Sequence, residues 1–313
     1  MDFGLHLPLI DFGNNPRTLD QLVEYAETSQ RLGFGGLAAN DHMVFSRPWL
    51  DGPTALAAVL AYSGRMDLTT TVSLPVVRGP VPLAKTLGAI DRLSGGRLIA
   101  CVGPGSSARD YDAVGISFEE RWKRLDEAIQ ALRALWNQDH PSFRGNFYNT
   151  EGVKLEPFPA RRAGPPIWVG SWGSKAGLRR VARLADGWLA SGYNTTPDLF
   201  ANGRELLQEF LVEEGKDPAS FPNAMASMWL YVTEDEREAE RMISEVLAPA
   251  INRPIPELRE RLPIGSARDC AEKLAAYQKV GVQRIYLWPL ANELEQIQVF
   301  RREVLPLIEG LEI

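Results

Sequence analysis

The sequence predicts an α/β fold, a TIM (β/α)8 barrel built from the 313-residue chain. Short apolar runs alternate with amphipathic stretches, a rhythm typical of repeated β-α units around a parallel sheet. The count of these units gives eight strand candidates, the number that closes such a barrel. An open doubly wound sheet is the alternative, but it normally carries a Gly-rich fingerprint after its first strand, and PLIDFGNN at 8–15 is not one. We expect one domain over residues 1–313.

The first half of the chain contains four strand-helix units. Pro53 falls in the first turn of the second helix, and Gly33 ends the first. The first helix repeats Leu19, Leu22, Val23, Ala26 and Leu32 at helical spacing, and the fourth places Leu125, Ile129, Leu132 and Leu135 on one face. The predicted strands are 3–7, 36–39, 68–77 and 97–103, and the predicted helices are 18–33, 53–64, 80–96 and 118–136.

The second half resumes the rhythm after an interruption at 137–165, which is rich in turn formers and aromatics and suggests a hairpin. A second irregular patch spans residues 248–256, and we expect a second insertion over about 248–265. Both insertions have the composition of lids and should shape the substrate site. The predicted strands here are 165–170, 187–192, 223–233 and 284–290, each followed by a helix, the last ending near Glu309.

Composition excludes several functions. A formal net charge of −6 disfavours non-specific nucleic-acid binding. No apolar run approaches the roughly 20 residues of a membrane span, and MDFGLHLPLI is not a readable signal peptide, so we expect a soluble cytoplasmic protein. Cys101 and Cys270 show no CxxC spacing, so we expect two buried packing residues and neither a disulfide nor a zinc site.

The carboxyl ends of the strands, where a barrel places its chemistry, are aromatic, hydroxyl-rich and glycine-rich with few charges. Glu234 and Asp235 resemble caps of the next helix, so a glycosidase lacks its paired carboxylates. A Schiff-base aldolase lacks a strand-end lysine, and three scattered histidines do not make a metal hydrolase. A broad, largely uncharged slot suits a large planar cofactor that brings its own reactivity.

One strand end predicts an anion site. Gly170, Ser171, Trp172, Gly173 and Ser174 form a donor-rich turn directly before a helix, whose first N–H groups point at whatever occupies the turn. The basic residues that follow are Lys175, Arg179 and Arg180. A phosphate fits this arrangement, and the alternative is a plain helix entry with a solvated basic face.

The histidines and their neighbours are the other candidates. Asp41 and His42 follow the second strand, which favours a catalytic role, although an aspartate there can simply cap a helix and a lone histidine can be structural. His6 ends the first strand and could line the same cavity, whereas His140 should lie on the surface. The turn at 102–105 contains glycines that would let a backbone approach a flat ring. Trp49, Trp172 and Trp288 are as consistent with packing as with cofactor contact.

Several stretches together resemble the bacterial luciferase-like superfamily of flavin and deazaflavin oxidoreductases, and most of all its coenzyme F-420-dependent branch. The resemblance extends to about residue 195. The matching stretches are FGLHLP, NDHMV, SLPVVRGPVPLAKTLGAIDRLSGGRLIACVGPGS, FEERWKRLDEAIQALRALW and PPIWVGSWGSKAGLRRVARLADGWLASG.

The resemblance implies roles for individual residues. Asp41 would touch the deazaflavin ring, and His42 would stand beside the hydride-transferring carbon as acid or base. The Gly170–Ser174 turn would hold the cofactor phosphate. A non-proline cis peptide within Thr70–Ser73 would form a bulge behind the ring, with Thr71 and Ser73 as contacts. Gly103, Gly105 and Ser106 would lie at the pyrimidine end; sugar-phosphate dehydrogenases of the family carry a glutamate after this turn, and Ser106 and Ser107 argue against that activity.

The implied reaction is hydride transfer between coenzyme F-420 and a small organic substrate. The first alternative is an FMN-dependent monooxygenase that activates oxygen and takes its reduced flavin from a partner reductase. A non-catalytic cofactor-binding barrel is the second. The resemblance also implies a homodimer built on the second and third helices.

Overall fold

The computed structural model describes residues 1–13, 17–137, 139 and 142–311. Eight parallel strands form a closed barrel, because each pairs with its neighbour and the pairings β6–β7 and β9–β1 close the ring. This confirms the predicted barrel and excludes the open sheet. The barrel strands are β1 (Asp2–His6), β2 (Gly36–Ala39), β3 (Asp67–Thr70), β4 (Leu98–Val102), β5 (Ile167–Gly170), β6 (Gly187–Ser191), β7 (Asn223–Val232) and β9 (Arg284–Pro289). All eight lie at the predicted places, and a short strand that was not predicted, β8 (Ile264–Gly265), pairs with β7 outside the ring.

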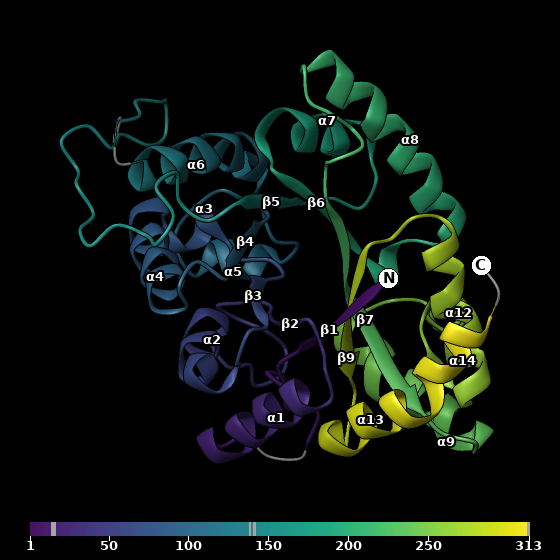
Figure 1. Cartoon of the computed structure of the whole chain (residues 1–313). Helices are drawn as coiled ribbons and strands as arrows, with labels where there is room; N and C mark the ends of the chain where they lie inside the picture. Colours follow the sequence, from purple (N-terminus) through teal and green to yellow (C-terminus); the bar gives the residue numbers. More distant parts are fainter. Residues whose placement is uncertain (14–16, 138, 140–141, 312–313) are drawn as a thin grey trace.

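Helices surround the barrel (Figure 1). The longer ones are α1 (Leu19–Arg31), α2 (Gly52–Val59), α4 (Pro80–Leu93), α6 (Arg121–Trp136), α7 (Lys175–Leu184), α8 (Pro197–Glu213), α12 (Ala267–Lys279) and α13 (Glu293–Val299). Shorter helices are α3 (Pro75–Arg78), α5 (Ala108–Asp112), α9 (Glu236–Arg241), α10 (Ala248–Ile251), α11 (Ile255–Arg261) and α14 (Leu305–Gly310). None of the helices in the described part of the chain has the length and apolar character needed to cross a membrane.

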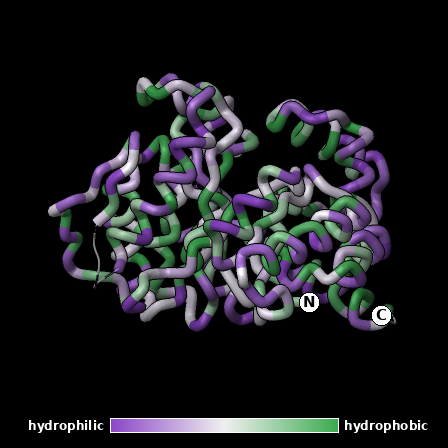
Figure 2. Tube along the Cα trace, turned by 90° about the horizontal axis from the view of Figure 1, so that it is seen from above, coloured by the Kyte–Doolittle hydropathy of each residue, from purple (hydrophilic) through white to green (hydrophobic). Residues whose placement is uncertain are grey.

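Local sequence explains how these helices begin and which face they bury. Thr18 and Gln21 form a capping box at the start of α1. The predicted apolar face of α6 is wholly buried, whereas Leu19, expected in the core, is 57% exposed because it opens α1 before the buried stripe. Seen from above, hydrophilic and hydrophobic residues alternate along the outer helices, as one buried face per helix requires (Figure 2). Cys101 and Cys270 are buried free thiols, as predicted.

Two predictions of secondary structure were wrong in part. The third strand was expected over 68–77 but ends at Thr70, because Pro75 opens α3 shortly after the chain turns at a cis Thr71–Val72 peptide. The 248–256 segment was expected to be irregular but forms α10 and the start of α11. α10 directly continues the π-helical stretch Met242–Leu247, and Pro256 stands in the first turn of α11, where an N–H would have no helical partner. Asn252 separates the two helices in a left-handed conformation, φ 52°.

The first insertion contains the predicted hairpin, with hydrogen bonds from Gly145 N to Tyr148 O and from Thr150 N to Phe143 O, both 2.8 Å. His140, expected on the surface, lies outside the described residues.

Candidate active site

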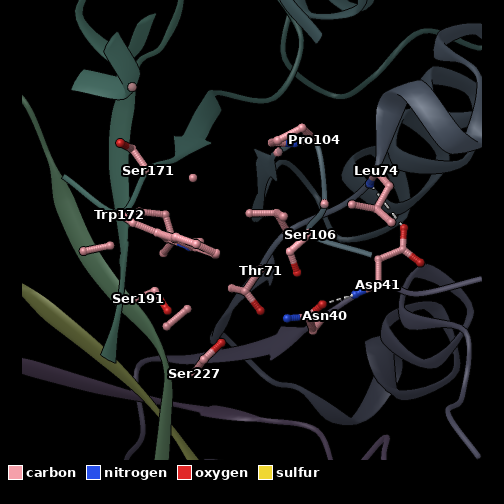
Figure 3. Close-up of a pocket in the computed structure, with 18 of the residues that line it drawn as sticks. Asn40, Asp41, Thr71, Leu74, Pro104, Ser106, Ser171, Trp172, Ser191 and Ser227 are labelled. Atoms are coloured by element: carbon pink, nitrogen blue, oxygen red, sulfur yellow. Dashed lines mark hydrogen bonds between the residues drawn. The ribbon is translucent and has the colours of Figure 1, made fainter. Parts of the chain in front are cut away.

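A cavity of about 410 Å³ opens at the carboxyl ends of the strands, where barrel enzymes place their chemistry. Thr71, Ser191 and Ser227 form part of its wall, and the side chains of Trp172 and Ser106 extend into it from opposite sides (Figure 3). The structure brings together ten of the residues predicted from sequence, namely Asp41, His42, Thr71, Gly103, Gly105, Ser106, Gly170, Ser171, Trp172 and Ser174. His6, Ser73 and Gly173 are not among the lining residues.

His42 lines the cavity in the loop after β2 and is oriented by a residue that sequence analysis did not identify. Its Nδ1 lies 2.8 Å from Oδ2 of Asp110 on α5. The other carboxylate oxygen of Asp110 accepts the backbone N–H groups of Met43 and Val44, both at 2.8 Å. No described residue hydrogen-bonds to Nε2 of His42. The imidazole is therefore anchored at one nitrogen and available at the other.

The buried carboxylate of Asp110 stays ionised in this setting. Burial on its own would raise the pKa of Asp110, but the hydrogen bonds from His42 and from the Val44 and Met43 amides outweigh burial and lower the pKa below its usual value. A carboxylate is an acceptor only, so Nδ1 of His42 carries the hydrogen between the two groups. The neutral tautomer presents a basic Nε2 to the cavity.

Asp41, the neighbour of His42 in sequence, has a different partner. Its buried carboxylate receives Nε of Arg78 at 2.7 Å and Nη2 of Arg78 at 2.6 Å, and it accepts the Leu74 amide at 3.3 Å. Arg78 also pairs with Asp51. The structure gives the two neighbours separate partners: Arg78 for Asp41 and Asp110 for His42. The Leu74 contact also places Asp41 at the start of α3, which agrees with the helix-capping alternative.

His6 lies beneath the cavity rather than on its wall, which corrects its expected role as a lining residue. It is fully buried, with its Nδ1 3.4 Å from Thr71 Oγ1 and its Nε2 accepting the Ser227 N–H at 3.2 Å. Its ring stacks on Trp288 at 4.1 Å. Burial lowers the pKa of His6 to about 3, so the imidazole is neutral. Trp288 is thus a packing residue here, and Trp49 packs edge-on against His42 and Trp288.

Ser73 and Gly173 also lie off the cavity wall. Ser73 is fully buried below the cis Thr71–Val72 bond, and its hydroxyl has no hydrogen-bond partner among the described residues. Gly173 turns away with φ 92° between Ser171 and α7. The cis bond itself falls inside the Thr70–Ser73 window expected from the family resemblance.

Glycines let the backbone close around Val72. A Cβ atom on Gly103 would lie 2.8 Å from Val72 Cγ2, and one on Gly170 would lie 3.0 Å from Val72 Cγ1. Larger residues at these positions would displace Val72 from the cavity wall. The result is a smooth, apolar surface of the kind that a flat ring can approach.

The turn after β5 leads directly into α7, as the sequence predicted. Ser174 caps α7 by accepting the Gly177 N–H at 3.2 Å, and Ser171 Oγ accepts the Gly173 N–H at 3.3 Å. Ser171, Ser174 and Gly177 line the cavity, so the start of α7 lies at its edge. Lys175 and Arg179, predicted to adjoin this turn, are not among the lining residues, whereas Arg180 is.

Two arginines line the same end of the cavity, and only Arg180 came from the sequence analysis. Arg180 pairs with Asp126 and lies 4.7 Å from the Trp122 ring. Arg121 packs 3.9 Å over Phe118 and donates to the Phe118 carbonyl at 2.8 Å. Among the described residues, no carboxylate forms an ion pair with Arg121. Its charge is therefore available to an anion in the cavity.

A closed (β/α)8 barrel with a histidine-aspartate pair and a serine-capped helix start at the carboxyl ends of its strands has the arrangement of an α/β-barrel enzyme. Residues 7–254 match the family model for luciferase-like monooxygenases, so the chain belongs to that family of oxidoreductases. The resemblance to the luciferase-like superfamily is thereby confirmed.

Known relatives use different cofactors. The chain is 26% identical to an FMNH2-dependent dimethylsulfone monooxygenase of Pseudomonas putida, over 92% of this chain and 85% of that protein. Its fold matches a monooxygenase from Streptomyces bottropensis, with TM-score 0.85, 23% identity and coverage of 98% and 99% of the two chains. It also matches an F-420-dependent secondary alcohol dehydrogenase bound to an F-420-acetone adduct, with TM-score 0.84, 20% identity and coverage of 98% of each chain.

Proposed function

We propose that this enzyme binds coenzyme F-420 in the 410 Å³ cavity and transfers a hydride to or from a small organic substrate. The observation that carries the proposal is His42, held by Asp110 at Nδ1 and presenting Nε2 to the cavity. When bound, the coenzyme supplies a deazaflavin ring that carries hydride in two-electron steps and reacts poorly with oxygen. The protein has to orient both reactants and manage one proton.

His42 would accept or donate this proton. Oxidation of an alcohol releases a proton with each hydride, and Nε2 can accept it because Asp110 holds Nδ1–H in place and stabilises the imidazolium that forms. In the reverse direction the imidazolium returns the proton to the oxygen. Asp41, bound to Arg78, would act as a positioning residue for this loop.

The cavity walls fit a coenzyme of this shape and charge. Val72, Gly103 and Gly170 would face the ring, since a Cβ on either glycine would close the space beside Val72. Ser171, Ser174 and the first N–H groups of α7 would hold the phosphate, as the sequence analysis expected. Arg121 and Arg180 would add charge at the same end.

An FMN-dependent monooxygenase is the second candidate. It is favoured by the likeness to an FMNH2-dependent monooxygenase over 92% of this chain. The same cavity would serve FMN, which also carries a ring and one phosphate, and the enzyme would then depend on a partner reductase.

Parallel titration of the purified apo-protein with coenzyme F-420 and with FMN, followed by quenching of cofactor fluorescence, tests the two candidates. Selective binding of F-420 supports hydride transfer. Selective binding of FMN with oxygen-dependent turnover would replace the first candidate with the second. His42→Ala should then keep cofactor affinity and lose turnover, and equal turnover in the variant and the wild type would remove His42 from the mechanism.

We also propose a homodimer whose interface includes α2 and α4. Light scattering coupled to size exclusion would test this, and a monomeric mass would contradict it.

A further inference from the structure

Beneath the cavity, two hydrogen bonds link the Ser227 backbone to His6 and His6 to Thr71 in the cavity wall, and the donor of each can be assigned. The Ser227 nitrogen is a backbone N–H and can only donate, and it lies 3.2 Å from Nε2 of His6. Nε2 must therefore be the acceptor. Ser227 reaches this position with φ 55°, at the point where the pairing of β7 with β9 shifts register between Met225 and Met228.

Because Nε2 accepts a hydrogen bond, the protonation of Nδ1, the other ring nitrogen, is determined. Neutral imidazole carries one hydrogen, so it must lie on Nδ1, which faces Thr71 Oγ1 at 3.4 Å. Burial keeps the His6 pKa near 3, and the ring is neutral at physiological pH. Trp288 lies parallel to the ring at 4.1 Å with an interplanar angle of 7°, and Trp229 stacks behind Trp288 at 4.1 Å. The ring plane and the two hydrogen bonds are thus fixed together.

Thr71 Oγ1 then receives a hydrogen from His6 and has its own hydrogen left to donate. Thr71 lines the cavity, and His6 is the one hydrogen-bond partner of its hydroxyl in the described part of the chain. Figure 3 shows the Thr71 side chain in the wall of the cavity, which Asn40 and Ser106 also line. The hydroxyl hydrogen is therefore free to be donated to an acceptor in the cavity.

We infer that His6 is a positioning residue that directs the Thr71 hydroxyl into the cavity as a hydrogen-bond donor, selecting a ligand with a carbonyl oxygen or ring nitrogen at that wall. This inference rests on the proposed function in one respect, because the ligand is taken to be the ring of F-420 or FMN, both of which carry such acceptors. It assigns no contact between His6 and the coenzyme. The direction of donation comes from the Ser227 backbone.

The test compares Thr71→Val with Thr71→Ser in binding of F-420 and FMN to the apo-protein. Valine keeps the size of the side chain and removes the donor, so we expect affinity for the bound coenzyme to fall about fivefold, the worth of one neutral hydrogen bond. The visible absorption bands of the bound ring should shift, because they respond to hydrogen bonding. Serine should retain both properties. The matched control is Thr70→Val. The hydroxyl of Thr70 donates to the Cys101 carbonyl at 2.6 Å, and Thr70 does not line the cavity.

His6→Phe tests the relay itself. Phenylalanine keeps a stacked ring but cannot donate to Thr71, so its effect on affinity should disappear in the Thr71→Val background. An equal loss of affinity in both backgrounds, or an unchanged affinity and spectrum in Thr71→Val, would overturn the inference. If His6→Phe does not fold, the Thr71 variants and their spectra decide alone. If the wild-type protein binds neither coenzyme, the proposed function fails. If the wild type binds a coenzyme but the Thr71 and His6 variants behave otherwise than expected, only this inference fails.

Discussion

Nδ1 of His42 lies 2.8 Å from Oδ2 of Asp110, although 68 residues separate the two in the chain. The contact joins the loop after β2 to the helix that follows β4, across the intervening strand. It gives a histidine at the cavity a fixed tautomer and a buried counter-charge. The chemistry of the site depends on this approach of two distant segments.

Replacing Asp110 by asparagine should lower turnover by about 100-fold while leaving coenzyme affinity nearly unchanged, because general acid-base catalysis contributes about that much. The amide can still accept the Met43 and Val44 N–H groups, but its NH2 group can face Nδ1 and reverse the tautomer. Steady-state kinetics and fluorescence titration measure the two quantities. Asp112→Asn, an exposed change on the same helix, is the control. Full activity in Asp110→Asn would remove the dyad from the mechanism.

Protein stability should fall on acidification because of His6. The pKa of His6 is lowered to about 3 by burial, against 6.5 for the ordinary group, so between these values the unfolded chain binds a proton that the folded chain does not. The contribution of neutral His6 to the free energy of unfolding is fully present above pH 6.5. It is lost as the pH falls towards 3, at about 1.4 kcal/mol per pH unit. Urea unfolding at a series of pH values gives the slope. His6→Phe should flatten it, and parallel slopes in the two proteins would contradict the assignment.

Arg121→Gln should weaken binding of FMN about tenfold, since a hydrogen bond to a charged group is worth roughly 1.5–3 kcal/mol. It should leave binding of riboflavin, which lacks the phosphate, unchanged. Lys175→Gln removes a nearby charge that does not line the cavity and should have little effect on either ligand. Equal losses for FMN and riboflavin would place Arg121 at the ring and not at the phosphate.

Gly103→Ala should impair both folding and coenzyme binding, because the new Cβ would lie 2.8 Å from Val72 Cγ2. Overpacking of this kind costs about 1–3 kcal/mol, measurable as a lower urea midpoint. Val72→Ala in the same chain removes the clashing methyl and should restore most of the stability. Failure of this second change to rescue would show that Gly103 is needed for another reason.

The barrel itself could be predicted from sequence, because apolar runs and helical spacing are local properties. All eight barrel strands and the buried face of α6 follow from them. The irregular segment expected at 248–256 was wrong, because Pro256 stands in the first turn of α11, where proline is tolerated.

The cavity could be predicted in part. Strand ends gave most of its wall, because parallel strands gather their carboxyl ends at one edge. The partners of the site residues were missed: Asp110 for His42, Arg78 for Asp41, and Arg121 at the anion end. These partners depend on how loops meet in space, and a single sequence carries no periodic signal for such meetings.

The ion pair between Asp41 and Arg78 has a consequence for how the cavity can open. Asp41 forms an ion pair with Arg78 on α3, the helix after β3. The next residue, His42, hydrogen-bonds to Asp110 on α5, the helix after β4. To move outwards, this loop would have to break the Asp41–Arg78 ion pair and the His42–Asp110 hydrogen bond together. We therefore expect the wall that carries His42 to keep its position when a ligand enters or leaves the cavity.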